Sequence, residues 1–436
     1  MESYQIAIVL LFTLFALLSL GFWVATTLFS VAILALVLNQ QSAIDMNLAT
    51  TVWSGSSSWT ISALPLFIWM GEVLFRTRLS EDLFKGLSPW LARLPGGLLH
   101  VNIIGCGIFA AVSGSSAATT ATIGKMSLPE LRKRGYAENM AMGTLAGSGT
   151  LGFLIPPSII LIVYGVSAEV SISRLFMAGA LPGLILVGLF MSYVVIWALL
   201  NPSKLPKEDS SLSFIEKLRS TKQLFPILLL IAFVIGSIYM GWATATEAAT
   251  LGVVGSLVLA WWSNALNWEM FKTSLTGAAC MSAMILLILA GASLLTVAMG
   301  FLRIPAMLAE WVVSMHLSAM WLLVALTILF AILGCFLDGI SVVVLTTSVI
   351  LPLVEASGIN LLWFGVYLVL VVEMSQITPP VGFNLFVIQS LTGRDIFKIG
   401  AYALPFFSIL LLAILILTIF PNIVLWLPEV LTQRAH

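Results

Sequence analysis

The chain has 436 residues, of which 60% are hydrophobic and only 9% are charged, and its mean hydropathy is +1.10. Soluble domains carry about 25% charged residues. The formal net charge is zero. This composition excludes a water-soluble enzyme and indicates that a lipid bilayer is the main solvent of the chain.

Apolar runs of about 20 residues, the length that a helix needs to cross the hydrocarbon core, recur along the whole chain. They lie at about 4–20, 22–38, 56–75, 137–165, 175–199, 225–240, 243–262, 274–296, 360–390 and 400–427. No basic region precedes the first run, so we expect it to stay as a transmembrane helix rather than a cleaved signal peptide. The three cysteines lie in apolar surroundings and are interpreted as core residues. The pattern predicts an all-α polytopic membrane protein.

Both halves of the chain carry the same pattern of prolines. Four pairs are separated by a constant 223 residues: Pro129 and Pro352, Pro156 and Pro379, Pro157 and Pro380, and Pro182 and Pro405. Such internal similarity indicates two copies of one structural unit. We expect a first repeat over 1–200, a linker over 201–224 and a second repeat over 225–436.

The basic residues indicate that the two repeats are inverted. If each repeat has about five crossings and one re-entrant hairpin, every Lys and Arg falls on the cytoplasmic side except Arg174, Arg303 and Arg434. The positive-inside rule favours this topology over its reverse. It places the N-terminus in the periplasm and the linker in the cytoplasm. Inverted repeats with an odd number of crossings are typical of secondary transporters.

The first predicted hairpin covers about 98–128. Basic residues flank it on both sides, yet its middle, Ser113–Thr120, consists of small and hydroxyl residues. Irregular backbone at membrane depth is tolerated only where protein or water covers it. A tip rich in hydroxyls and free carbonyls is typical of a site for a hard cation or an anionic group. The alternative interpretation is a small-residue face for helix packing.

The second predicted hairpin covers about 317–352 and enters from the periplasm. It contains Asp338, which has no basic residue nearby in the sequence. An aspartate at mid-membrane costs about 2.5–3.5 kcal/mol on insertion scales, and a bound cation would remove most of that cost. The alternative is a structural aspartate that caps the helix starting at Ile340.

Two long apolar stretches, about 137–165 and 360–390, are interrupted by glycines and by a Pro-Pro pair. Proline removes a backbone donor, so neither stretch is expected to be one continuous helix. Unwinding frees carbonyl groups for coordination, and Thr150 and Thr378 add hydroxyls. A Pro-Pro pair could instead produce a simple kink, but its presence in both halves favours a pair of sites.

The remaining polar residues carry less information. Arg303 is the one basic residue in the outer half of the second repeat, where it could attract an anionic substrate or simply snorkel to the surface. The histidines are scattered and indicate neither a proton relay nor a metal cluster: His100, His316 and His436.

With these residues in view, the chain resembles the large membrane subunit of the tripartite ATP-independent periplasmic (TRAP) transporters, the DctM-like family. The matching stretches occur in the order that the family shows and span nearly the whole chain. They are Leu64–Glu72, Arg93–Gly97, Ser113–Thr122, Gly149–Ser158, Leu175–Gly183 and Thr378–Phe386.

The resemblance implies an elevator-type transporter of the bacterial inner membrane, with Na⁺ as coupling ion, no cofactor and an organic acid as substrate. The partners that it implies are a separate small four-helix membrane subunit and a periplasmic substrate-binding protein. No nucleic acid is expected among the partners.

The resemblance also assigns residues to sites. The residues expected to bind Na⁺ are Ser113, Gly114, Ser115, Ser116, Gly149 and Thr150 in the first site, and Asp338, Gly339, Thr378 and Pro379 in the second. The residues expected to bind the substrate are Thr119, Pro157, Arg303, Ser341, Pro380 and Asn384.

Three other functions are compatible with parts of the pattern. A stand-alone Na⁺/organic anion symporter of related fold would need no binding protein, and a passive channel could also contain paired hairpins. An intramembrane serine enzyme is disfavoured, because no histidine falls in either broken helix. We therefore expect a transporter and not an enzyme.

Overall fold

The structure is a computed structural model of the chain. It describes residues 3–41, 43–77, 79–206, 217, 220–222, 224–307, 310, 318–380 and 382–433. Within these ranges every regular element is a helix, and no strand occurs. The predicted all-α class is confirmed.

The first part of the chain forms short and medium-length helices that lead into the 29-residue helix α11. Its helices are α1 (Ser3–Ser19), α2 (Val24–Leu38), α3 (Ile44–Ser56), η1 (Trp59–Ser62), α4 (Ala63–Phe75), α5 (Leu79–Leu91), α6 (Leu99–Ser113), α7 (Ser116–Lys133), α8 (Glu138–Gly149), α9 (Leu151–Leu154), α10 (Ile159–Ser167), α11 (Ile172–Leu200) and η2 (Pro202–Lys204).

The second part begins with two helices joined by a short connection to α15, a helix of 34 residues. Its helices are α13 (Phe225–Tyr239), α14 (Ala245–Trp262), α15 (Trp268–Phe301), α17 (Ala319–Gly334), α18 (Gly339–Ala356), α19 (Leu361–Gln376), α20 (Phe383–Thr392), α21 (Ile396–Ile419) and α22 (Asn422–Gln433).

Several of these helices are suited to cross a bilayer. Among the described residues, α11, α14, α15 and α21 are each long and apolar enough to do so alone. Three bent pairs raise the number to seven if each pair is one span, including Glu138–Leu154 with Ile159–Ser167, which meet at 41°. The multi-pass character of the chain is confirmed, while the number of crossings in each repeat stays a prediction.

Helix starts recur at the same 223-residue interval as the prolines. Ser115 is the N-cap of α7 and Asp338 is the N-cap of α18, while α8 and α19 begin at Glu138 and Leu361. Ser and Asp suit these positions because their side-chain oxygens accept hydrogen bonds from the free amides of the first turn. Each half therefore contains two helices joined by a tight break, followed by an interrupted helix.

The second helix of each hairpin is longer than the sequence indicates. Pro129 lies inside α7, which ends at Lys133, and Pro352 lies inside α18, which ends at Ala356. Proline inside a membrane helix is tolerated where neighbouring groups or local adjustment satisfy the carbonyl that it leaves free. Both prolines therefore lie within helices.

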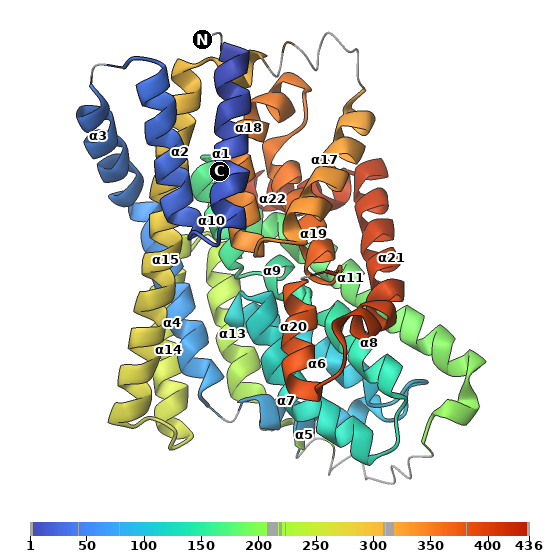
Figure 1. Cartoon of the computed structure of the whole chain (residues 1–436). Helices are drawn as coiled ribbons and strands as arrows, with labels where there is room; N and C mark the ends of the chain where they lie inside the picture. The colour runs from blue at the N-terminus through green and yellow to red at the C-terminus, as the bar shows by residue number, and fades with distance from the viewer. Residues whose placement is uncertain are drawn as a thin grey trace.

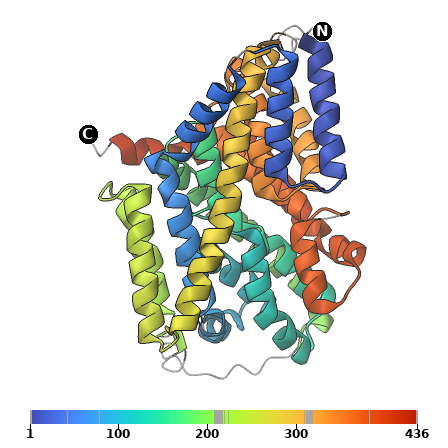
Figure 2. The same ribbon diagram turned by 60° about the vertical axis from the view of Figure 1, so that its left-hand side comes forward.

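The helices form two groups that lie side by side (Figure 1). In one group α15 packs along α2, α3 and α4, and α14 packs on α4 and α13. In the other, α6, α7, α8 and α20 pack around one another, and α21 packs on α8. Figure 2 shows α15, in yellow, running along almost the full height of the molecule.

A glycine face on α8 allows close packing against α21. A β-carbon at Gly143 would lie 2.5 Å from the carbonyl oxygen of Tyr402, and one at Gly147 would lie 2.5 Å from the ring of Phe406. Phe406 also contacts the rings of Phe190 and Tyr193 on α11, at centroid distances of 5.4 and 5.2 Å. Small residues at such contacts are how membrane helices approach closely.

We predict that Gly143→Ala lowers stability by about 1–3 kcal/mol, because the new methyl group meets backbone that must move. Thermal unfolding of the purified protein in detergent measures the effect. Gly188→Ala is the matched control, since a β-carbon there meets no atom within 4 Å. Equal unfolding midpoints for the two variants would contradict the close α8–α21 contact.

Candidate functional site

The tip of the first hairpin is a two-residue break between α6 and α7. Gly114 follows α6 in the left-handed conformation, with φ of 58°, which glycine adopts without steric cost. Ser115 then caps α7, its hydroxyl accepting a hydrogen bond of 3.4 Å from the Ala118 amide. The carbonyl of Gly114 accepts a hydrogen bond of 3.2 Å from the Ile159 amide at the start of α10. The tip is therefore attached to the interrupted helix of the same half.

The backbone of this tip touches the backbone of the interrupted helix. A β-carbon at Gly152 would lie 2.5 Å from the carbonyl oxygen of Ser115 and 2.6 Å from the Ser116 amide nitrogen. A β-carbon at Gly114 would lie 3.0 Å from the carbonyl oxygen of Pro157. Glycine is needed at both positions because no side chain fits between the two segments.

Hydroxyl groups within the tip bond mainly to one another. The hydroxyls of Ser113 and Thr119 are 2.8 Å apart, and the Thr119 hydroxyl donates to the carbonyl of Ser115 at 2.7 Å. These three expected site residues therefore lie together. Their arrangement fixes the first turn of α7 and the direction in which Ser116 leaves the tip.

Four buried residues from four helices form what we name the Ser116 cluster: Ser116 of α7, Gly149 of α8, Glu373 of α19 and Asn384 of α20. The Ser116 hydroxyl lies 3.1 Å from the carbonyl oxygen of Gly149 and 3.2 Å from Glu373 Oε2, and it can donate to either. Asn384 Nδ2 donates to Ser116 Oγ at 2.7 Å. Glu373 Oε1 accepts from the amide of Phe153 at 2.9 Å. Residues far apart in the sequence thus meet in one polar centre.

Glu373 is the member of this cluster that the sequence interpretation missed. Its side chain is 1% exposed, and no Lys, Arg or His in the described part of the chain forms an ion pair with it. It lies in an apolar run five residues before Thr378, with no basic neighbour in the sequence. The argument that singled out Asp338, an unpaired carboxyl group in an apolar segment, would also have found Glu373.

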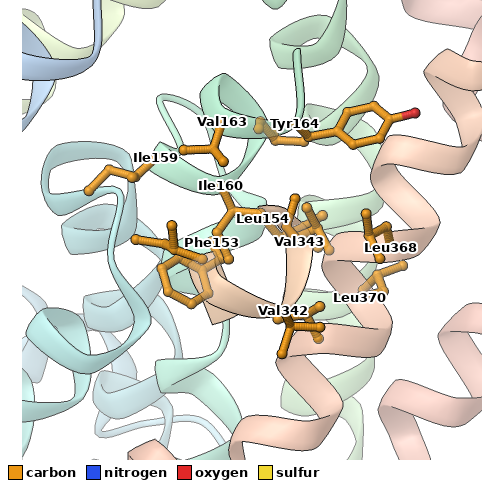
Figure 3. Packing of buried hydrophobic residues seen from close by; sticks show 14 of the residues in the cluster. Phe153, Leu154, Ile159, Ile160, Val163, Tyr164, Val342, Val343, Leu368 and Leu370 are labelled. Atoms are coloured by element: carbon orange, nitrogen blue, oxygen red, sulfur yellow. The ribbon is translucent and has the colours of Figure 1, made fainter. Parts of the chain in front are cut away.

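The second hairpin closes against both interrupted helices. A β-carbon at Gly339 would lie 2.9 Å from the Phe153 ring, 2.9 Å from Val372 and 3.0 Å from Ile160. Figure 3 shows the surrounding apolar cluster, in which Phe153, Leu154 and Ile160 of the first half gather with residues of the second half such as Val342 and Leu370. The start of α18 therefore lies against the same segment that the first tip contacts.

Asp338 caps its own helix, as the structural alternative expected. Its carboxylate accepts hydrogen bonds of 3.2 Å from the amides of Ile340 and Ser341, and the Ser341 hydroxyl also donates to it. The helix that it caps begins at Gly339. Asp338 and Ser341 lie together, but no hydrogen bond joins Asp338 to Thr378 within the described residues. The second hairpin contacts the interrupted helix of its own half through Cys335, whose Sγ donates to the carbonyl of Pro379 at 3.6 Å.

The two threonines predicted in the interrupted helices bond within their own segments. The hydroxyl of Thr150 donates to the carbonyl of Gly147 at 2.6 Å, and that of Thr378 donates to the carbonyl of Met374 at 2.8 Å. Pro380 is exposed, and the Pro156–Pro157 and Pro379–Pro380 bonds are both cis. Arg303 is exposed beyond the end of α15, with φ of 55°.

The oxygen atoms of the Ser116 cluster fit a hard cation. Asn384 Oδ1, on the other arm of the amide that donates to Ser116, is buried and accepts no hydrogen bond from the described residues. A buried acceptor without a donor is costly unless an ion or water takes its place. Ser116 Oγ, the carbonyl of Gly149 and Asn384 Oδ1 are neutral oxygens that suit an alkali cation, and the carboxyl group of Glu373 lies beside them.

The chain is similar to known transport proteins. Residues 11–423 match the family described as the tripartite ATP-independent periplasmic transporter, DctM component. Over 384 residues the chain is 32% identical to the C4-dicarboxylate TRAP transporter large permease protein DctM of Pseudomonas aeruginosa, covering 88% of this chain and 89% of that protein. Over 415 residues it is 29% identical to the sialic acid TRAP transporter large permease protein SiaM of Vibrio cholerae, covering 95% and 96%.

A solved structure supports the fold alone. The YdaH transporter of Alcanivorax borkumensis superposes with a TM-score of 0.63 at 14% sequence identity, over 87% of this chain and 88% of that one. The likeness extends along almost the whole length of both chains. It therefore concerns the complete arrangement of helices and not one isolated motif.

We predict that Gly152→Ala removes most of the substrate uptake while the protein still inserts in the membrane. The added β-carbon must displace the backbone of Ser115 and Ser116, which moves the Ser116 hydroxyl away from Gly149 and Glu373. Substrate uptake into liposomes measures the loss, and we expect it to reach about 100-fold. Gly236→Ala, where a β-carbon meets no atom within 4 Å, is the control. Unchanged uptake by Gly152→Ala would contradict the close contact.

Proposed function

The chain belongs to the DctM component family of the tripartite ATP-independent periplasmic transporters, and from this membership we propose that it carries a small organic acid across the inner membrane by Na⁺-coupled secondary transport. The Ser116 cluster is the observation that supports this function best. A hairpin tip and two interrupted helices meet there, and their oxygen atoms suit a cation.

The substrate class follows from the relatives and not from a substrate pocket. The named relatives handle C4-dicarboxylates and sialic acid, so a dicarboxylate, a sialate or a similar carboxylate is the substrate that we propose. Helix N-termini carry a partial positive charge that favours anionic groups. The starts of α7 and α18 lie at the two hairpin breaks and could supply that charge near the proposed sites.

We also propose an elevator mechanism, in which one group of helices moves and the other stays in place. The hairpins and interrupted helices, α6–α10 and α17–α20, would form the mobile unit, and the group around α15 would form the scaffold. The side-by-side arrangement of the two groups in Figure 1 is compatible with this assignment, with α18 packing on α15 and α6 on α4 where the groups meet. The long α15, which packs along α2, α3 and α4, would give the scaffold a rigid wall.

Two partners complete the proposed transporter. A small four-helix membrane subunit would bind the scaffold within the bilayer, and a periplasmic substrate-binding protein would deliver the organic acid. The N-terminus would lie in the periplasm, as the distribution of Lys and Arg favours.

Uptake in proteoliposomes tests the proposal. We would reconstitute the chain with its small subunit and measure uptake of radiolabelled C4-dicarboxylates and sialic acid, with and without a Na⁺ gradient and the binding protein. We expect uptake to require both. Uptake that needs the gradient but no binding protein would support a stand-alone symporter, and flux without a gradient would support a channel.

The second proposed Na⁺ site is tested by Asp338→Asn. Asparagine caps helices about as well as aspartate, so the start of α18 should stay formed while the charge is lost. We predict that the Na⁺ concentration for half-maximal uptake rises about tenfold, whereas the thermal unfolding midpoint stays close to that of the natural protein. An unchanged Na⁺ dependence would show that Asp338 is only a helix cap.

A further inference from the structure

Glu373 is a carboxylate that the second half of the chain places against the first half. It lies near the end of α19, and each of its oxygens lies within hydrogen-bond distance of a donor in the first half. Oε1 accepts from the Phe153 amide at 2.9 Å, and Oε2 lies 3.2 Å from the Ser116 hydroxyl. Glu373 thereby links the two halves of the chain.

The Ser116 hydroxyl has one proton and two acceptors in reach. A serine hydroxyl donates once and accepts through two lone pairs. One lone pair accepts from Asn384 Nδ2 at 2.7 Å. The proton can point either to the carbonyl of Gly149, at 3.1 Å, or to Glu373 Oε2, at 3.2 Å. The two orientations exclude each other.

Only one of these orientations suits a bound cation. A hydroxyl that ligates a cation must turn its proton away from the ion. When the proton points to Glu373, the free lone pair of Ser116 can face the side of the Gly149 carbonyl, and both oxygens can face the same ion. When the proton points to Gly149, it lies between these two oxygens and hinders an ion from binding both. Glu373 therefore favours the orientation in which the cluster can coordinate an ion.

From this geometry we propose that Glu373 is a positioning residue of the first cation site: it accepts the Ser116 proton and so aims Ser116 Oγ and the Gly149 carbonyl at the ion. The proposal rests on the Na⁺-coupled function proposed above. Its consequence is that the affinity of a site built on first-half residues depends on the placement of α19 in the second half. Partners that orient the ligands of a metal typically change affinity by 10- to 100-fold when they are replaced.

Glu373→Gln separates this role from a purely structural one. Glutamine has nearly the same shape, and its carbonyl oxygen can still accept from the Phe153 amide. Its NH₂ group, however, is a donor and must face Ser116, which turns the serine proton toward Gly149. We expect the Na⁺ concentration for half-maximal uptake to rise about tenfold or more, with a smaller change in the maximal rate.

The experiment titrates Na⁺ in the reconstituted complex, with the binding protein loaded with substrate, and it also records the thermal shift that Na⁺ alone produces in the purified protein. Glu247→Gln is the matched control. It removes an exposed carboxylate on α14, whose capping role glutamine can also fill. We expect it to leave both readouts unchanged.

A double-mutant cycle with Ser116→Ala tests whether Glu373 changes the Na⁺ affinity through the Ser116 hydroxyl. If Glu373 acts through the serine proton, Glu373→Gln should add little to the loss that Ser116→Ala already causes. Glu373→Asp, which keeps the charge on a shorter side chain, should give partial recovery of Na⁺ affinity. If Glu373→Gln fails to fold, the same cycle is measured with Glu373→Asp in its place.

The outcomes distinguish this proposal from the proposed function. Na⁺-dependent uptake by the natural protein, together with an unchanged Na⁺ dependence in Glu373→Gln, would overturn the positioning role and leave Na⁺ coupling intact. Fully additive effects of Glu373→Gln and Ser116→Ala would overturn it as well. Uptake by the natural protein that is independent of Na⁺ would overturn both proposals.

Discussion

The structure depends on how the backbone at the first interruption is satisfied inside the membrane. An unpaired amide or carbonyl costs several kcal/mol in hydrocarbon, so a helix can be broken there only if other groups replace the missing bonds. Between Phe153 and Leu161 those groups are supplied from outside the helix and by one local hydroxyl. The Phe153 amide donates to Glu373, and the Ile159 amide donates to the carbonyl of Gly114. The Ser158 hydroxyl donates to the carbonyl of Phe153 before the break and accepts from the amide of Leu161 after it.

This constraint explains why the hairpin, the two interrupted helices and the polar cluster occur together. The first tip provides a carbonyl to the broken helix, and the broken helix provides the glycine that lets the tip approach, with Gly152 against Ser115. Neither segment could keep its irregular backbone alone. The same contact brings Ser116 to Gly149, so the groups that stabilise the break are adjacent to the groups that could hold an ion.

Much of this was predictable from the sequence because it depends on local chemistry. The apolar runs predicted an all-helical membrane protein. The motifs around Ser113–Thr122 and the two Pro-Pro pairs were among those that indicated the family. Both predictions are confirmed. The tip at Ser113–Ser116 and the interruption near Pro156 were also recognisable, since glycine, serine and proline act on the backbone where they stand.

Contacts between distant segments were not predictable in the same way. Glu373 and Ser116 are 257 positions apart, and nothing in the sequence near either residue indicates that the two are in contact. Asn384 was predicted to bind substrate, which stays a prediction, and the sequence did not indicate that its amide donates to Ser116 in the cluster. Asp338 and Thr378 were predicted to belong to one cation site, and in the structure the carboxylate of Asp338 accepts hydrogen bonds from the free amides of its own helix. Such choices depend on which groups the fold brings within about 3 Å.

The two halves are related in sequence but not equivalent in chemistry. At the 223-residue interval Ser115 corresponds to Asp338, and Thr150 corresponds to Glu373, so hydroxyls in the first half stand where the second half has carboxylates. Thr150 bonds within its own helix, whereas Glu373 extends to the tip of the other half. The second half therefore contributes a buried carboxyl group to a cluster in which the first half supplies neutral oxygens. Because a charge inside the membrane costs about 2.5–3.5 kcal/mol on insertion scales, a cation bound beside Glu373 would stabilise the contact between the halves as well as fill the site.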